Sequence, residues 1–413
     1  MIRSKNRLAL GLAAGAVALA LAGCSGGASG GSTAAPTPAP TETGAERVDS
    51  PGVTATTVSI GTISDQTGPT TGIQLPWLHG VQAAIEAVNA EGGINGRTIE
   101  IIAEDDKYDA AVGQPAFKKL VDQTPVAAIL GLNTGNMQAA VLPSIETGTV
   151  PVLSGQTTIL DAINPVKEYF FGLAPTYADQ VDAILAYAPE RLGKEDFSVV
   201  VVHNGAATGV EVEELTKERA VGGIELLGSV VLESAATSAD AQLQTVIGLD
   251  PDLVLFHGSG AGVNLFNRAQ EKFDTHYPLI GISPSGGPGA FAGVTPEFGN
   301  LYEYVQWAYP VPIEAPGTAA MVEAAEAVGF GEEVNNPDFV AGYAGGLVII
   351  EAIRVAGENP SREAIAAALS SMSGFSTGGI TADVSFSATD RVGIQEFVPL
   401  KWNYETSSFE IAE

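Results

Sequence analysis

Cysteine is nearly absent from this sequence of 413 residues, which contains only one, Cys24. The chain therefore cannot form an internal disulfide or a metal site built from several thiolates. Its four histidines, His79, His203, His257 and His276, fall in separate segments without the close spacing of metal ligands. We therefore predict no metal site, and we expect an apolar core to stabilise the folded body.

Positive charge is also scarce. The sequence has 19 Lys and Arg against 48 Asp and Glu, which gives a formal net charge of −29. A chain this acidic repels the phosphates of nucleic acids and the headgroups of anionic lipids. The composition therefore argues against a nucleic-acid partner and against charge-driven binding to a membrane surface, but it does not select a ligand.

Catalytic and nucleotide-binding motifs are incomplete. The glycine-rich run 258–262 follows an apolar strand and opens a helix, but Val263 stands where a dinucleotide fingerprint needs its last glycine. Ser283 lies two positions after Gly281, but Ser285 stands where a nucleophile elbow needs glycine. The sequence also lacks the glycine–lysine pattern of a P-loop. We therefore predict a protein without a cofactor that is not an enzyme.

Three carboxylates, Asp105, Asp106 and Asp109, follow a predicted strand. Such a group can serve acid–base chemistry or bind a hard cation. These residues also precede a predicted helix, and a helix N-terminus favours negative charge. Helix capping is the interpretation we prefer, and a cation site is the alternative.

The amino terminus has the pattern of an export signal. Basic residues at positions 3, 5 and 7 precede an apolar run over 8–21, which is shorter than the roughly 20 residues of a spanning helix. The tetrapeptide Leu-Ala-Gly-Cys at 21–24 resembles the bacterial lipobox, in which the cysteine becomes the diacylated first mature residue. This resemblance implies a signal peptide over 1–23 and a lipid anchor at Cys24 on the outer face of the cell membrane. A plain signal peptide or an inner-membrane anchor helix is the alternative.

A linker follows the cysteine. Residues 25–50 are almost entirely Ser, Gly, Ala, Thr and Pro, a composition that cannot bury enough apolar area to offset its ordering entropy. We predict a flexible tether over 24–54. No later apolar run is expected to be long enough to span a membrane, so the lipid anchor is the only predicted membrane contact.

From residue 57 the chain alternates between strand and helix patterns. Asn336-Pro337 and Asn359-Pro360 each precede a helical pattern, and Asn before Pro is typical of a helix start. This alternation predicts an α/β protein with parallel sheets, and the length favours two lobes. The expected strands are 58–63, 98–103, 127–132, 150–153, 198–202, 226–232 and 253–256, and the expected helices are 75–91, 110–123, 137–147, 181–188, 210–220, 240–249, 339–356 and 362–371.

Polar loops follow several predicted strands, at 67–68, 133–136, 154–158 and 208–209. In open parallel sheets, ligands bind beyond the carboxyl ends of strands, where helix N-termini converge. Backbone N–H groups and hydroxyls at these ends suit a carboxylate ligand. Since no nucleophile–base pair stands beside them, the pattern favours binding over catalysis.

Segments 64–69, 80–84 and 88–96 resemble the leucine/isoleucine/valine-binding protein family, the type I periplasmic solute-binding proteins of branched-chain amino-acid ABC importers. The run Val-Asn-Ala-Glu-Gly-Gly-Ile-Asn-Gly at 88–96 is its most specific part, and the resemblance extends over 57–402. It implies the type I periplasmic-binding-protein fold, with two doubly wound parallel-sheet lobes joined by three crossovers. The implied lobes are 55–174 with 306–392, and 177–303 with 396–413. A ligand would close between them and pass to ABC permease subunits. The runner-up is a ligand-sensing receptor of this fold that signals through a membrane partner.

The resemblance also implies where the ligand is held. The expected contacts come from two loops of the first lobe, from the first crossover, from the second lobe and from the first long helix. They are Gly135, Asn136, Gln156, Thr158, Tyr177, Thr208, Ser283 and Trp77, with Ile73 beside Trp77.

One expected contact departs from the family pattern. The carboxylate that receives a ligand ammonium usually follows the strand ending at 279–281, where this chain has Ser283. A buried ammonium without a carboxylate is costly, so the ligand is predicted to be either an amino acid or an apolar or aromatic acid. Asp179 and Glu211 are the acidic residues that would supply the missing carboxylate.

Overall fold

The computed structural model describes residues 2–3, 50–147, 150–156, 159–310 and 313–412. A five-stranded parallel sheet has the order β3-β2-β4-β5-β6. Its strands are β2 (Thr57–Ser64), β3 (Thr98–Asp105), β4 (Ala128–Leu130), β5 (Val152–Ser154) and β6 (Phe170–Gly172). Both β4 and β5 are completely buried, as expected for parallel strands covered on both faces.

The second sheet has eight strands in the order β1-β12-β11-β10-β9-β7-β8, with β13 paired to β12. Five of them are parallel: β7 (Phe197–His203), β8 (Ile224–Val231), β9 (Leu253–Phe256), β10 (Leu279–Gly281) and β11 (Tyr302–Gln306). The remaining three are antiparallel additions at one side: β12 (Glu396–Asn403), β13 (Ser408–Ile411) and the two-residue β1 (Ile2–Arg3).

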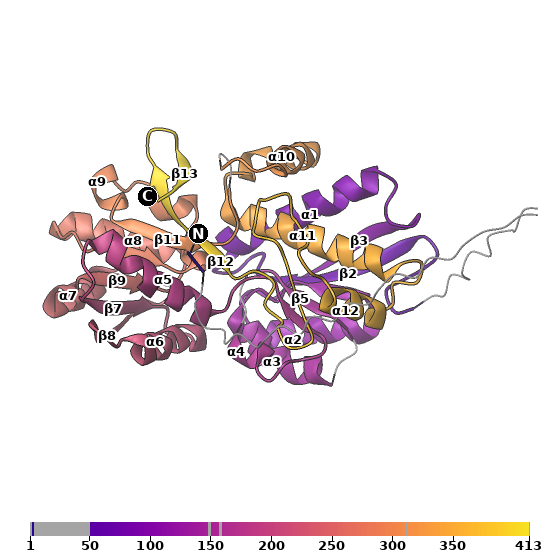
Figure 1. Cartoon of the computed structure of the whole chain (residues 1–413), viewed down its shortest axis with the longest axis horizontal. Helices are drawn as coiled ribbons and strands as arrows, with labels where there is room; N and C mark the ends of the chain where they lie inside the picture. Colours follow the sequence, from indigo (N-terminus) through magenta and orange to yellow (C-terminus); the bar gives the residue numbers. More distant parts are fainter. Residues whose placement is uncertain (1, 4–49, 148–149, 157–158, 311–312, 413) are drawn as a thin grey trace, which may run out of the picture. The chain divides into compact units, whose positions relative to one another are not determined.

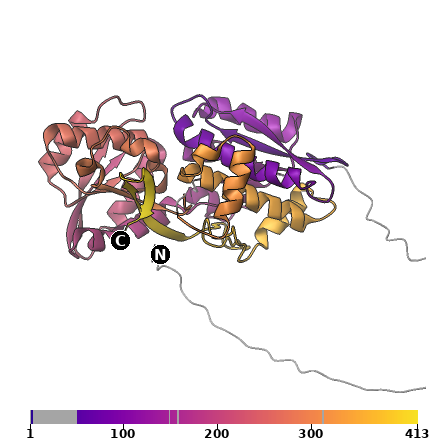
Figure 2. The ribbon, with the colours of Figure 1, turned by 90° about the horizontal axis from the view of Figure 1, so that it is seen from above.

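Helices follow most of the parallel strands and pack against the sheets (Figure 1 and Figure 2). The described helices are α1 (Thr71–Ala90), α2 (Ala110–Lys118), α3 (Gly135–Glu146), α4 (Leu160–Ile163), α5 (Tyr177–Leu192), α6 (Ala207–Arg219), α7 (Asp240–Leu249), α8 (Gly260–Phe273), α9 (Pro296–Gly299), α10 (Thr318–Ala327), α11 (Pro337–Ala356) and α12 (Arg362–Ser370). Alternating strands and helices of this kind confirm the α/β class predicted from the sequence.

The longest helices, α1 and α11, lie side by side next to the first sheet (Figure 1). Glycines allow their backbones to meet, because a Cβ at Gly80 would lie 2.0 Å from the Phe339 carbonyl oxygen. A Cβ at Gly342 would lie 1.9 Å from the carbonyl oxygen of Trp77. This close packing places the first turn of α11 beside the loops that follow the strands of the first sheet.

Helix α11 also corrects one expectation. It spans 20 residues and is apolar enough to cross a membrane by length and composition, whereas we expected no such segment after residue 21. Most of α11 is buried inside the protein, including Phe339, Val348 and Ile349, which have no exposed surface. Its apolar character is therefore that of a core helix.

Local details differ from the sequence expectations at two helices. The expected helix 110–123 becomes α2 followed by a π-helical turn over Lys119–Gln123. Asn336 caps α11 as predicted, through a bond from the Asp338 backbone N–H. The prediction for Asn359 is wrong, because Ser361 caps α12 and accepts a bond from the backbone N–H of Ala364. Serine is an equally good cap, and it stands next to the first helical residue.

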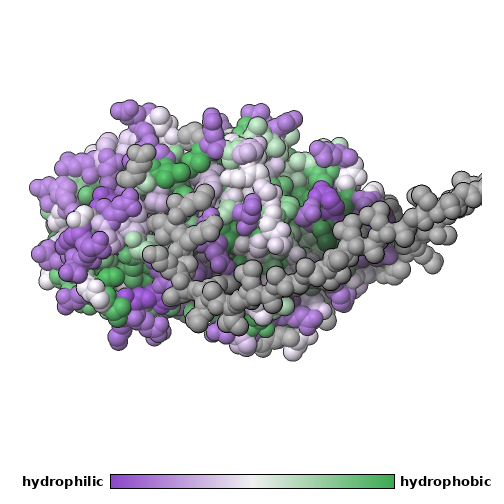
Figure 3. Space-filling model, viewed as in Figure 1, coloured by the Kyte–Doolittle hydropathy of each residue, from purple (hydrophilic) through white to green (hydrophobic). Residues whose placement is uncertain are grey.

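The exposed surface mixes residue types. On the face in Figure 3, hydrophilic and apolar residues are interspersed. Exposed large apolar side chains such as Val221 and Val355 come from separate elements. The predicted anchor Cys24 and nearly all of the predicted signal peptide and tether lie outside the described residues.

Candidate ligand-binding cleft

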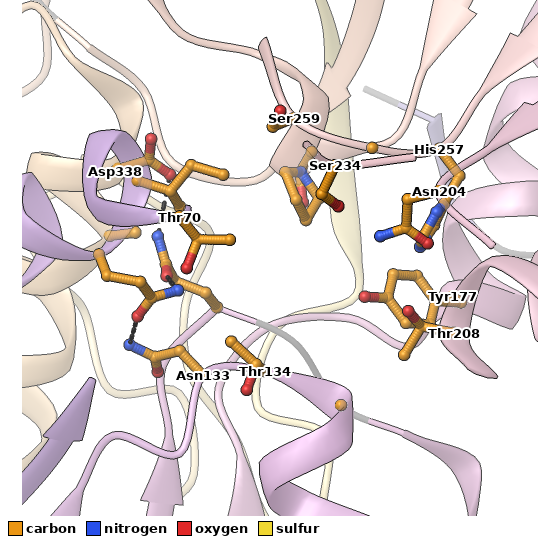
Figure 4. Close-up of a pocket in the computed structure, with 18 of the residues that line it drawn as sticks. Thr70, Asn133, Thr134, Tyr177, Asn204, Thr208, Ser234, His257, Ser259 and Asp338 are labelled. Carbon is orange, nitrogen blue, oxygen red and sulfur yellow. Dashed lines mark hydrogen bonds between the residues drawn. The ribbon is translucent and has the colours of Figure 1, made fainter. Parts of the chain in front are cut away.

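A cavity opens at the carboxyl ends of strands from both sheets, and its empty space, including the part open to solvent, is about 720 Å³. The first sheet contributes loops after β2, β3, β4 and β5, and the second sheet contributes loops after β7, β9 and β10. The lining residues are Thr70, Ile73, Gln74, Tyr108, Asn133, Thr134, Gly135, Gln156, Tyr177, Asn204, Thr208, Ser234, His257, Gly258, Ser259, Ser283, Pro284, Gln306, Trp307, Asp338 and Ala341. Figure 4 shows polar side chains pointing into this space from opposite walls.

The structure brings most of the predicted contact residues to this cavity. Gly135, Gln156, Tyr177, Thr208 and Ser283 line it, as does Ile73. These residues are far apart in the sequence, and the loops at the strand ends place them around one space. Their role as ligand contacts remains a prediction.

Two predicted contacts, Trp77 and Asn136, are not among the described lining residues. Trp77 is completely buried and packs over Gly155, where a Cβ would lie 2.6 Å from the indole ring. Asn136 is used inside the protein, since its Nδ2 donates to the Tyr108 carbonyl at 3.2 Å. Thr158 lies outside the described residues. Trp77 therefore packs inside the protein in this structure, and its role as a ligand contact remains a prediction.

Helix N-termini surround the cavity. Thr134 and Ser259 are the N-cap residues of α3 and α8, and Tyr177 and Thr208 lie in the first turns of α5 and α6. Each N-terminus presents free N–H groups and a partial positive charge, which attract an anion. No Lys or Arg occurs among the described lining residues. An anionic ligand group would therefore be held by N–H groups and hydroxyls.

A chain of side-chain amides runs behind the first wall of the cavity (Figure 4). The Gly155 N–H donates to Asn133 Oδ1 at 3.0 Å, and Asn133 Nδ2 donates to Gln74 Oε1 at 3.0 Å. Gln74 Nε2 then donates to Gln156 Oε1 at 2.9 Å. The last amide, Gln156, donates from Nε2 to Oδ1 of Asp338 at 2.9 Å. The chain therefore ends on a carboxylate.

Asp338 is a residue of the cavity wall that the sequence reasoning missed. It is the only carboxylate among the described residues that line the cavity. The residue is partly buried, and desolvation raises the pKa of Asp338 to about 8, although the hydrogen bond from Gln156 acts in the opposite direction. In the sequence, Asp338 was visible only as an acidic residue directly after Asn336-Pro337. Such a residue is usually explained by the preference of a helix N-terminus for negative charge.

The two acidic residues expected to replace a carboxylate near Ser283 do not line the cavity. Asp179 forms a capping box with Thr176 at the start of α5. Glu211 accepts a hydrogen bond from the backbone N–H of Leu160, and burial is the main reason that its pKa is raised to about 7. Both carboxylates are therefore already bound to backbone groups.

The opposite wall is aromatic and neutral. Tyr177 and His257 pack edge to face with ring centroids 5.3 Å apart. Burial, with a smaller effect of His203, lowers the pKa of His257 to about 3, so its imidazole is neutral at physiological pH. Its Nδ1 has no hydrogen-bond partner among the described atoms. This nitrogen is available for a polar group of a ligand.

The acidic cluster after the first two strands is mainly structural. Asp65, Asp105 and Asp106 lie with carboxylate oxygens within 4.8 Å of one another. Asp65 accepts hydrogen bonds from Thr70, and Asp105 accepts one from the Gln66 N–H at 2.9 Å. The predicted cap is confirmed for Asp109, which accepts from the Ala111 N–H at 2.8 Å.

Comparisons with known proteins agree with this architecture. The family model described as periplasmic binding protein matches residues 57–407. A Leu/Ile/Val-binding protein homolog 8 of Brucella abortus is 23% identical over 317 residues, covering 71% of this chain and 75% of that protein.

Solved structures show the same fold. A branched chain amino acid ABC transporter protein from Thermus thermophilus with bound valine has a TM-score of 0.78 at 18% identity, covering 86% of this chain and 95% of that chain. A fatty acid ABC transporter substrate-binding protein from Thermomonospora curvata also has a TM-score of 0.78 at 20% identity, covering 89% of this chain and 94% of that chain. The predicted family and fold are therefore confirmed: the chain belongs to the periplasmic binding protein family, has the type I fold, and its relatives are solute-binding proteins rather than enzymes.

Proposed function

We propose that this protein is the extracytoplasmic substrate-binding component of an ABC importer. It binds a small amino acid or a related carboxylate in the cavity and delivers the molecule to permease subunits. The observation that carries the proposal is the cavity itself, where loops from both sheets, several helix N-termini and one partly buried carboxylate converge. The names of the Brucella and Thermus proteins support the transport role and the amino-acid ligand.

We also propose that the lobes 55–174 with 306–392 and 177–303 with 396–413 close over the ligand. Gly135 supports this, because a Cβ there would lie 2.2 Å from Cγ2 of Thr208 on the opposite wall. Only a glycine lets the two walls approach this closely. Hinge closure of this kind is common among periplasmic binding proteins. Small-angle scattering should give a smaller radius of gyration with ligand, and an unchanged radius at saturation would contradict closure.

A ligand screen by thermal shift tests the proposed function. A ligand that binds only the folded state at 100 times its Kd stabilises the protein by about 2.7 kcal/mol. We expect at least one compound among branched-chain, aromatic and small polar amino acids and short carboxylic acids to raise the melting temperature. Gln156→Ala should abolish this shift, whereas Gln114→Ala, on the exposed surface of α2, should retain it. A flat response across the panel would contradict the proposal.

We further propose that Cys24 carries a diacylglyceryl group and that residues 1–23 are removed. The pairing of β1 with β12 would then belong to the precursor alone. Cys24→Ala should remove the acylated thiol, so the protein should stay unprocessed or be released in soluble form. Detergent partitioning and mass spectrometry measure both effects. A Cys24→Ala protein that still enters the detergent phase with an unchanged mature mass would contradict the lipid anchor.

A further inference from the structure

Asp338 lies in the first turn of α11, yet it does not cap that helix. Asn336 performs this role, since its Oδ1 accepts the hydrogen bond from the Asp338 backbone N–H at 2.9 Å. The Asp338 carboxylate is therefore free to point into the cavity, on the side opposite Tyr177 and His257 (Figure 4). The N-terminus of α11 favours negative charge at this position.

The amide chain has a fixed direction. The Gly155 backbone N–H can only donate, so Asn133 must present its oxygen to it and its NH₂ group to Gln74. Since Gln74 accepts this bond with its oxygen, its NH₂ group donates to the oxygen of Gln156. The NH₂ group of Gln156 then donates to Asp338. Asp338 Oδ1 thus always receives a hydrogen bond. Its other oxygen, Oδ2, has no partner among the described residues and is the group left for a ligand.

Among the described residues that line the cavity, no Lys or Arg offers Asp338 a compensating positive charge. Tyr108 and His257 also line the cavity, and Tyr304 lies close enough to Asp338 to be affected by its charge. Burial raises the pKa of both tyrosines and lowers that of His257, so all three are neutral at physiological pH. An ionised Asp338 therefore lacks a cation, which a ligand can supply. A ligand that brought only a carboxylate would leave Asp338 protonated and would form no charge pair with it.

We infer that Asp338 binds a cationic group of the ligand, so that the ligand is an ammonium-bearing carboxylate such as an amino acid and not a plain carboxylic acid. This inference rests on the proposed function and narrows its ligand class. The anionic end faces the helix N-termini around Gly135 and Thr208, and the ammonium faces Asp338. The carboxylate missing near Ser283 is therefore supplied by a different element, α11.

Matched ligand pairs test the inference by calorimetry. The pairs are leucine and 4-methylpentanoate, phenylalanine and 3-phenylpropanoate, and 4-aminobutanoate and butanoate, which differ only in the ammonium group. We expect the best-binding amino acid to bind at least a hundredfold more tightly than its deaminated partner. Asp338→Asn should weaken the amino acid at least thirtyfold and the deaminated acid less than threefold. Asp240→Asn, which removes an exposed hydrogen-bond partner of Lys272, is the control. It should change neither the affinity for the amino acid nor the affinity for the deaminated acid.

The outcomes separate the two proposals. If a deaminated acid binds as tightly as its amino acid, or if Asp338→Asn keeps the preference, the inference is wrong and the proposed function stands. If neither these six compounds nor any compound of the thermal-shift panel binds wild-type protein, both are contradicted. Circular dichroism shows whether Asp338→Asn folds. If it does not fold, the number of protons released when wild-type protein binds a ligand tests the inference. Binding of an amino acid should release a proton, and binding of a deaminated acid should not.

Discussion

Gly342→Ala is expected to destabilise the protein by about 3 kcal/mol or more. The new Cβ would lie 1.9 Å from the carbonyl oxygen of Trp77, a backbone atom that cannot rotate away. Helices α1 and α11 would have to separate, and Gly80 meets Phe339 just as closely on the other helix. Urea denaturation followed by circular dichroism measures the loss. Because Asp338 lies on α11, we also expect weaker ligand binding.

The matched control is Gly72→Ala in the first turn of α1. A Cβ at Gly72 meets no atom within 4 Å. Alanine has a higher helix propensity than glycine, so this variant should be unchanged or more stable by about 0.5–1 kcal/mol. Equal stability of the Gly342→Ala and Gly72→Ala proteins would show that the close contact between the two helices is not required.

At pH 7, binding of an amino acid is expected to release close to one proton. Desolvation raises the pKa of Asp338 to about 8 in the ligand-free protein, so the carboxyl group is mostly protonated at neutral pH. A ligand ammonium favours the ionised form and lowers this pKa. Affinity should therefore rise about tenfold per pH unit from pH 6 toward pH 8 and then level off. Below this window the stabilising charge pair is progressively lost.

Calorimetry in phosphate and in Tris measures this proton release, because the two buffers have different ionisation enthalpies. The Asp338→Asn protein is the control and should give the same binding enthalpy in both buffers. A wild-type enthalpy that is independent of the buffer would contradict the assignment of the proton to Asp338.

The same pKa also affects the stability of the ligand-free protein. Since the folded-state pKa of Asp338 lies above its ordinary value of 3.8, the folded protein binds this proton more tightly than the unfolded chain. Its contribution to stability is therefore present at low pH and is lost as the pH rises between about 4 and 8. Ligand binding offsets the loss by providing a cation.

Local patterns in the sequence were sufficient for most secondary-structure elements. The strand Leu253–Phe256 and the helix Asp240–Leu249 have the predicted bounds, because continuous apolar runs and clear helix periodicity are local properties. The start of α11 at Asn336-Pro337 was predictable for the same reason, since capping depends on neighbouring residues. The resemblance over 57–402 also identified the family.

The tertiary structure alone decided which side chains face the cavity. Gln156 and Asp338 are 182 residues apart, and their hydrogen bond forms only because α11 packs against α1 through Gly80 and Gly342. The same packing buries Trp77, which the sequence suggested as a ligand contact. Sequence patterns determined the strands, the helices and the polar loops, because these depend on local periodicity and capping. The position of the Asp338 carboxylate in the cavity depends on packing between distant segments, which a local sequence pattern cannot predict.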